Sequence, residues 1–160
     1  MSLILFALVA AWPAQQLSDG DTIVALAWER RRKDVADPAV QCIELDGPSM
    51  ADRIRLPDHM MQVVIGKDTS QQLNRVRLRR IAKGEGQTLA FDIKRLGLPG
   101  PSPACKYRYS VNAPVQIDGG IAYVHVGMHC GSFCGGGEIL VMERREGTWR
   151  ILEELLSWAT

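Results

Sequence analysis

Two cysteines and a histidine lie beside a run of glycines in the segment HCGSFCGGG, residues 129–137. Closely spaced thiolates and imidazoles are typical ligands of zinc, and a cysteine near a histidine is also the pairing that activates a nucleophile. Two histidines, His125 and His129, and the carboxylate of Glu138 flank or belong to this segment. One hypothesis is therefore a small hydrolase or a metal-dependent enzyme that uses this part of the chain.

The spacing of these residues favours a different interpretation. His125 and His129 share a face of a predicted strand, but the rise of an extended strand separates them by ~13 Å, too far to bind one ion. A redox pair usually has the spacing C-x-x-C at the start of a helix, whereas Cys130 and Cys134 have three residues between them and glycines follow them. We therefore predict no metal and no cofactor, and we interpret Cys130 and Cys134 as a disulfide.

The chain has four cysteines, Cys42, Cys105, Cys130 and Cys134, and an even set of four allows three pairings. The short glycine-containing loop lets Cys130 reach Cys134. The remaining pair, Cys42 and Cys105, would close a long loop and would restrict the unfolded chain the most. Reduced thiols would instead favour the metal or catalytic hypothesis, as in an intracellular zinc protein.

The first residues resemble an export signal. Residues 3–11 are an unbroken apolar run, and Ala11 and Ala14 supply small residues at which a signal peptidase could cut. No Lys or Arg precedes the run, so a buried first element of the mature fold is the alternative. The run is too short to span a bilayer. The sequence thus predicts a signal peptide within residues 1–14 and a periplasmic or secreted protein.

The composition sets further limits on the function. A chain of 160 residues with 46% hydrophobic residues is long enough for one domain with its own core, which we assign to residues 15–160. The 19 Lys and Arg balance 18 Asp and Glu, for a net charge of +1. A nearly neutral chain has no global field that would attract nucleic acid or an anionic membrane. We expect neither nucleic acid nor a stable membrane span among its partners, only a small ligand or an envelope protein.

A helix is predicted over residues 22–35. Residues 18–21 offer several N-cap candidates, and the basic residues 30–33 suit the negative end of the helix dipole. We expect that basic run to be a solvated helix end, with a contact patch as the alternative. The apolar residues fall close to one face: Ile23, Val24, Ala27 and Trp28.

The middle of the chain predicts short strands. Residues 40–45 and 60–65 are apolar runs of strand length. Residues 74–81 alternate apolar residues with arginines, and residues 89–93 alternate again after a glycine-rich turn. We expect these last two segments to form a hairpin with an arginine-rich outer face. His59, just before the second run, has no predicted partner.

The last third gives the clearest pattern. Alternation predicts strands at 107–117, 121–129, 139–144 and 149–158, joined as an antiparallel meander. Pro114 marks an edge or a bulge. Trp149 and Trp158 would face opposite sides of one strand unless a bulge intervenes, so one of them could line a concave face. The fold class is therefore α+β, with an N-terminal helix packed on a twisted antiparallel sheet and a C-terminal meander.

The order DGGIAYVHV, CGSFCGGG, ILVMERREGTWRI and LLSWAT resembles a group of small, uncharacterised exported bacterial proteins. In that group a CG-x-x-CG loop follows a strand with an Ala-aromatic-Val core, and a G-x-W turn and a final Trp close the chain. The resemblance covers about residues 105–160 and implies an exported, disulfide-containing domain with no known activity. The order of elements is also similar to that of NTF2-like or cystatin-like folds, an architectural analogy that implies no function.

The sequence thus predicts a non-enzymatic domain that binds a ligand or partner in the cell envelope, with the small hydrolase or metal-dependent enzyme as the alternative. A cavity with convergent polar groups would indicate ligand chemistry, whereas a flat face would indicate a protein partner or no site. The side chains that we expect to face a ligand are Tyr123, His125, His129, Glu138 and Trp158.

Overall fold

The computed structural model describes residues 17–34, 41–44, 69–131 and 134–159. It confirms the α+β class, with helices and a seven-stranded sheet. The predicted signal peptide, the strand at 60–65 and His59 lie outside the described residues. The elements are α1 (Asp19–Arg31), η1 (Arg32–Asp34), β1 (Gln41–Glu44), α4 (Thr69–Ala82), β2 (Gln87–Thr88), α5 (Ile93–Leu96), β3 (Tyr107–Val111), β4 (Val115–Ile117), β5 (Ile121–His129), β6 (Gly135–Arg145) and β7 (Thr148–Ala159).

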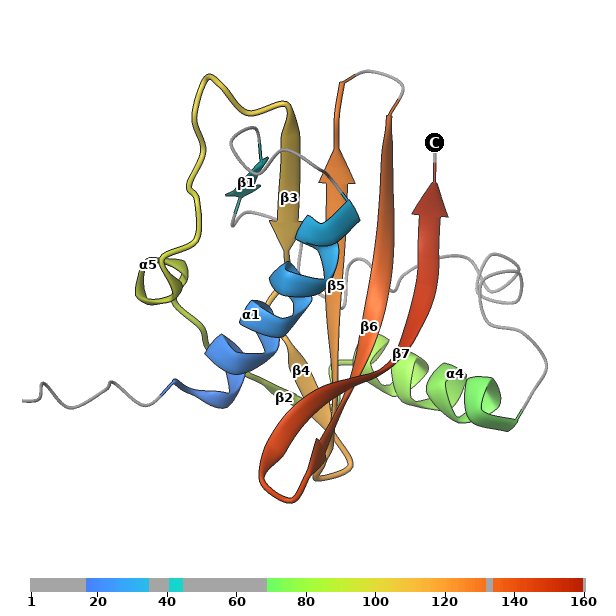
Figure 1. The fold of residues 1–160 in the computed structure, drawn as a ribbon. Coiled ribbons are helices and arrows are strands. Elements are labelled where there is room, and N and C mark those ends of the chain that lie inside the picture. Colours follow the sequence, from blue (N-terminus) through green and yellow to red (C-terminus); the bar gives the residue numbers. More distant parts are fainter. Residues whose placement is uncertain (1–16, 35–40, 45–68, 132–133, 160) are drawn as a thin grey trace, which may run out of the picture.

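The long strand β5 organises the sheet (Figure 1). Its whole length pairs with β6 on one edge, and β7 follows β6. The other edge pairs with β3 near the end of β5 and with β4 near its beginning. The predicted strand at 107–117 is thus two strands interrupted next to Pro114, as its proline indicated. All pairings are antiparallel except that of β1 with β3, which is parallel.

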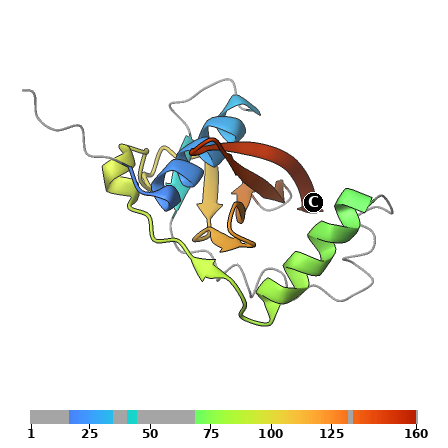
Figure 2. The same cartoon turned by 90° about the horizontal axis from the view of Figure 1, so that it is seen from below.

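Both faces of the sheet are covered by apolar side chains. The even-numbered residues of β5 from Ala122 to Val126 pack with α1 in one core, and Tyr123 packs with α4 in a second core. Figures 1 and 2 place α1 and α4 on opposite sides of the strands. The alternation predicted for β5 is therefore correct, and its two faces belong to two cores rather than to a core and a solvent face.

The N-terminus of α1 is clamped to the segment before α5. Ser18 caps the helix and forms a capping box with Asp21. The buried carboxylate of Asp21 also accepts hydrogen bonds from the amide of Asp92 at 2.8 Å and from the guanidinium of Arg95 at 2.8 Å. Gly20 lies so close to this segment that a Cβ atom would approach the Ala90 carbonyl oxygen to 2.2 Å. The start of α1 therefore depends on a glycine and a carboxylate at consecutive positions.

The C-terminal end of α1 binds the sheet. Arg30 forms a bidentate pair with Glu154 on β7, at 2.5 and 2.9 Å. Arg31 lies 3.2 Å from Glu138 on β6, and both side chains are largely buried. The prediction of a solvated helix end is therefore correct for the exposed Arg32 and Lys33 and wrong for Arg30 and Arg31, which pair with acidic residues of the last two strands.

Residues 74–81 form part of helix α4, so the strand predicted there is wrong. The buried side chains are Asn74, Leu78 and Ile81, which have the i, i+4, i+7 spacing of one helical face. The strand prediction placed the apolar residues Val76 and Leu78 on one face, yet Val76 is 53% exposed. A polar anchor at Asn74 hid the helical period from a pattern based on hydrophobicity.

The second strand of the predicted arginine-rich hairpin is also wrong. Only Gln87–Thr88 is extended, as β2, and Ile93–Leu96 is the short helix α5. Asp92 caps α5, and Gly97 ends it with a φ of 62°. Leu89 and Ile93 are buried in the core beneath α1 although they do not belong to one strand. Their burial, not their backbone, produced the alternation in the sequence.

The pairing of β7 with β6 shifts register twice. The first shift lies between Gly137 and Glu138 of β6, and the second lies between Val141 and Met142. Trp149 lies in the core beneath α1, whereas Leu155 lies in the core beneath α4, although both numbers are odd. A bulge at the second shift explains this change of face. The backbone of Trp158 pairs with Gly137, but its side chain lies outside the described residues.

Among the described residues, no helix is both long enough and apolar enough to cross a membrane.

The clamp at Asp21 predicts how stability depends on pH. Burial alone would raise the pKa of Asp21, but hydrogen bonds from Asp92 and Ser18 and the charge of Arg95 lower it below its ordinary value of 3.8. A carboxylate with a lowered folded-state pKa contributes its full stabilisation above the unfolded pKa and loses it as the pH falls through the folded pKa. We expect Asp21→Asn to reduce the free energy of unfolding by about 2 kcal/mol at neutral pH.

Urea unfolding of wild type and Asp21→Asn should therefore differ most near neutral pH and converge in acid, as the pH falls through the lowered pKa of Asp21. Asp19→Asn is the control, since Asp19 is in the same helical turn but is partly exposed in its pair with Arg144. Its effect should stay below about 1 kcal/mol. A difference between wild type and Asp21→Asn that persists unchanged in acid would contradict the assigned cause.

Candidate functional site

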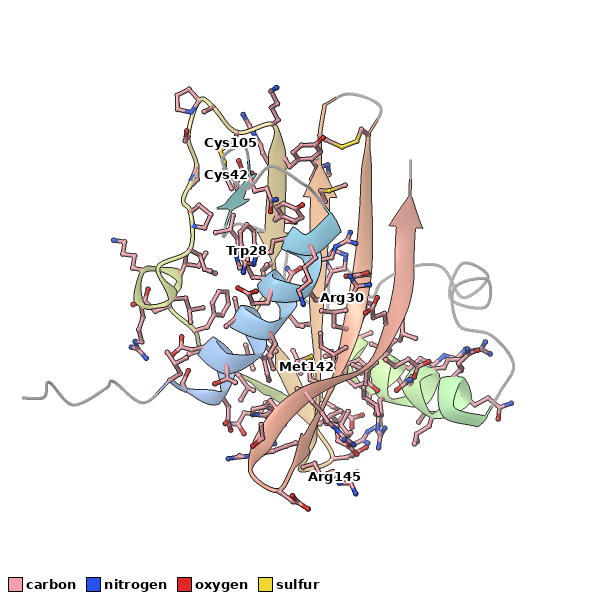
Figure 3. The ribbon with its side chains drawn as sticks, viewed as in Figure 1. Trp28, Arg30, Cys42, Cys105, Met142 and Arg145 are labelled. Atoms are coloured by element: carbon pink, nitrogen blue, oxygen red, sulfur yellow. A yellow bond between two sulfur atoms is a disulfide. The ribbon has the colours of Figure 1, made fainter. Side chains whose placement is uncertain are left out.

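Both predicted disulfides are present, Cys42–Cys105 and Cys130–Cys134. The described residues include no free cysteine. Figure 3 shows Cys42 and Cys105 at one end of the sheet, away from Arg145, which marks the hairpin between β6 and β7. Because the β5–β6 connection carries Cys130 and Cys134, both disulfides lie at the same end of the molecule.

A hollow of about 640 Å³ lies at this end, between the start of β3 and the connection from β5 to β6. Both disulfides border it, one through Cys105 and the other through both of its cysteines. The residues of the described chain that line it are Cys105, Lys106, Tyr107, Arg108, His129, Cys130, Gly131 and Cys134.

Three basic side chains border the hollow: Lys106, Arg108 and His129. Arg108 and His129 are register partners across β3 and β5, so they project from the same face of the sheet. No carboxylate lines the hollow within the part of the chain that the structure describes. Arg108 also lies 3.6 Å from Glu44, in an exposed pair. The described lining is therefore cationic.

Arg108 also borders a second, smaller hollow of about 300 Å³, together with Glu44 and the proline-rich segment 101–103. Arg108 therefore lines both hollows. A guanidinium offers a planar fork of donors that suits carboxylate and phosphate oxygens. Its exposed pair with Glu44 is weak enough for a ligand to displace.

The disulfide-bearing connection is held by its backbone as well as by its sulfur atoms. The amide of Cys130 donates to the carbonyl of Cys134 at 3.0 Å. Gly131 has a φ of +110°, a conformation that side chains other than glycine rarely adopt. The ladder between β5 and β6 continues up to the pair of His129 with Gly135. Glycines therefore let the chain turn between two strands whose ends the disulfide joins.

Tyr123 does not face a ligand. It is fully buried, and its hydroxyl donates to Asn74 of α4 at 2.6 Å. Asn74 in turn donates to Glu153 of β7 at 2.6 Å. Burial raises the pKa of Tyr123 to about 12, so the phenol stays protonated and can donate. This chain of hydrogen bonds fastens α4 to the sheet.

His125 is also buried, with 1% of its surface exposed. Its Nδ1 lies 3.1 Å from the side-chain Oδ1 of Asn112. The backbone amide of Asn112 donates to the backbone carbonyl of His125. Asn112 stands at the break between β3 and β4. The histidine therefore fixes the point where that interrupted strand changes register.

Glu138 faces the opposite side of the sheet from His125. It pairs in register with Val126, which packs beneath α1, and its carboxylate contacts Arg31. A catalytic group made of His125, His129 and Glu138 is therefore excluded by the alternation of β5 and β6. Of the four expected ligand-facing side chains that the structure describes, only His129 lines the hollow, and the side chain of Trp158 lies outside the described residues.

The geometry also bears on the metal hypothesis. Both cysteines of the segment are joined in a disulfide, so neither offers the thiolate that a metal or a nucleophilic mechanism needs. Within the described ranges, no group of three or more His, Cys, Asp and Glu side chains is placed to hold a metal ion.

Lys106 and Arg108 are the residues of the hollow that the sequence analysis missed. The sequence analysis placed Arg108 only within the predicted strand at 107–117. Its pairing with His129 depends on the register of β3 against β5, which no local pattern states. The signal that could have found them is their position directly after Cys105, since a disulfide fixes its neighbours in space.

Comparison with known proteins finds no matching family model, no matching curated protein and no matching solved structure. The resemblance to small exported bacterial proteins and the NTF2-like or cystatin-like analogy therefore stay predictions.

The two disulfides should contribute unequally to stability. Cys42 and Cys105 are 63 residues apart, whereas Cys130 and Cys134 are only 4 apart. Because a cross-link stabilises mainly by restricting the unfolded chain, we expect a loss of about 4 kcal/mol for Cys42→Ala/Cys105→Ala and about 2 kcal/mol for Cys130→Ala/Cys134→Ala. Chemical unfolding of the two double variants measures the difference, and equal losses would contradict it.

Proposed function

We propose that this protein is an exported, disulfide-stabilised binding domain whose ligand site is the hollow beside the two disulfides. One observation supports this most strongly: three basic side chains and both disulfides border the same hollow. The disulfides hold the ends of β1, β3, β5 and β6, from which the basic groups project. Such a fixed arrangement reduces the ordering cost that a ligand must overcome.

Export is supported by the two disulfides, because disulfides persist in oxidising compartments and are rare in the cytosol. The apolar run of residues 3–11 followed by small residues supports the same compartment. The compartment that we propose is the periplasm or the outside of the cell.

The ligand that suits the hollow is a small molecule or a chain end with an anionic group. Lys106 and Arg108 are exposed, so they can reach a carboxylate or phosphate without a buried charge being created. Arg108 can bind two oxygens of one anionic group at once. The adjoining hollow at residues 101–103 gives room for a neutral part of the same ligand.

The competing function is a small hydrolase at the same end of the sheet. The catalytic group predicted for it does not assemble, because His125 is buried beside Asn112 and Glu138 contacts Arg31 on the other face of the sheet. Binding requires only the charges that line the hollow. The geometry therefore favours a binding protein over the enzyme.

Export predicts a specific mass. The full chain, expressed with its own N-terminus and alkylated under denaturing, non-reducing conditions, should lack about its first eleven to fourteen residues and take up no alkyl groups. Intact mass spectrometry measures both quantities at once. A full-length chain with four alkylated cysteines would overturn the proposed compartment.

If the hollow binds anions, substitution of its basic residues should weaken phosphate binding. Inorganic phosphate, added to the full chain in a titration followed by NMR, should shift the signals of His129 and its neighbours. Lys106→Gln/Arg108→Gln should weaken binding about tenfold or more, since charge-assisted hydrogen bonds contribute ~1.5–3 kcal/mol.

The matched control is Lys94→Gln/Arg145→Gln, which removes one lysine and one arginine that are exposed and do not line the hollow. It should leave phosphate binding unchanged. Equal weakening by both double variants would show a general charge effect, and the proposed site would be wrong.

A further inference from the structure

The two disulfides differ in their access to solvent. Cys42 is 3% exposed within β1, whereas its partner Cys105 is half-buried and lines the hollow. Cys134 is exposed and Cys130 is half-buried, and both line the hollow. A thiolate must approach a disulfide sulfur directly in order to attack it. Cys130–Cys134 is therefore the more open of the two bonds, and Cys134 is its more open sulfur atom.

Backbone contacts also hold together the segments that carry Cys130 and Cys134. Register pairs join β5 to β6 from Ile121↔Glu143 to His129↔Gly135, immediately before the loop. The backbone hydrogen bond from Cys130 to Cys134 spans the same loop. With only four residues of separation, breaking the bond releases little chain entropy. The two thiols would stay close and could join again.

The surroundings of the bond favour a thiolate. Lys106 and Arg108, which carry positive charge, line the same hollow as Cys130 and Cys134. Nearby positive charge stabilises the thiolate form of cysteine, and a stabilised thiolate is a faster leaving group in exchange. The same charges attract an incoming anionic thiol.

We propose that Cys130–Cys134 is an exchangeable disulfide that reacts in this hollow with thiols that carry carboxylates, while Cys42–Cys105 stays closed. The exchange itself rests on exposure and loop length. The preference for an anionic thiol rests on the proposed binding function.

The chemistry proceeds in two balanced steps. The incoming thiolate attacks the Sγ of Cys134, a mixed disulfide forms, and the Sγ–Sγ electron pair leaves on Cys130. A second thiolate then attacks the incoming sulfur of the mixed disulfide and releases the oxidised thiol dimer. Two thiols are oxidised, one protein disulfide is reduced, and the protein thiolates take up protons from water.

The experiment exposes the folded, oxidised protein to reduced glutathione, an anionic thiol, and to cysteamine, a cationic thiol, at equal thiolate concentrations. Free thiols are then trapped by alkylation and located by peptide mapping. We expect Cys130 and Cys134 to be modified while Cys42 and Cys105 are not. The rate with glutathione should exceed that with cysteamine on the order of tenfold at low ionic strength.

Lys106→Gln/Arg108→Gln should remove the preference for glutathione, whereas Lys94→Gln/Arg145→Gln should keep it. Opening of both disulfides together, or of neither before the protein unfolds, would overturn the exchange. Selective opening of Cys130–Cys134 with no preference for glutathione would refute the anionic substrate class.

The phosphate titration separates this inference from the binding function. If the wild-type protein binds phosphate but neither thiol opens Cys130–Cys134, the exchange is rejected and the binding function is kept. If the wild-type protein does not bind phosphate and reacts with both thiols at the same rate, the anion site is rejected. Cys130→Ala/Cys134→Ala should give no modified cysteine with either thiol, and cooperative unfolding in urea shows that this variant is folded.

Discussion

The burial of β5 on both faces is the constraint on which the rest of this structure depends. One strand of nine residues pairs along its full length with β6 and along its other edge with β3 and β4. Because side chains alternate along a strand, its even-numbered residues pack beneath α1 and Tyr123 beneath α4. A shift of one residue in this register would exchange the two cores.

The two helices are attached to the sheet by polar contacts of different kinds. The α1 helix is held at its start by the buried Asp21 and at its end by Arg30 and Arg31. The α4 helix is held through Asn74, between Tyr123 and Glu153, and by Asp118 in the β4–β5 turn, which pairs with Arg77 and Arg80. Each hydrogen bond or ion pair selects one position of a helix on an otherwise apolar surface, which hydrophobic burial alone cannot do.

The sequence predicted the elements whose pattern depends on neighbours along the chain. The last four strands alternate clearly, and the turns at Asp118–Gly119 and Glu146–Gly147 have positive φ values at both central residues, as short hairpins require. The prediction failed for α4, where a buried asparagine replaces an apolar anchor, and for residues 89–93, where burial alternates without a strand. Hydrophobicity reports burial, and it identifies a backbone conformation only when every buried position is apolar.

For the site too, the sequence predicted what depends on neighbours along the chain and missed what depends on the pairing of strands. Both cysteine pairs were predictable because loop length and an even count limit the choices. The residues that border the hollow with them were not, since Arg108 meets His129 only through the pairing of β3 with β5. The side chains that we expected to face a ligand were chosen because they are close in sequence. Side chains alternate between the faces of a sheet, so His125 and Glu138 lie on adjacent strands but on opposite faces. In a sheet buried on both sides, side chains meet at a surface site mainly where strands end, and there the disulfides and the basic side chains of this protein lie together.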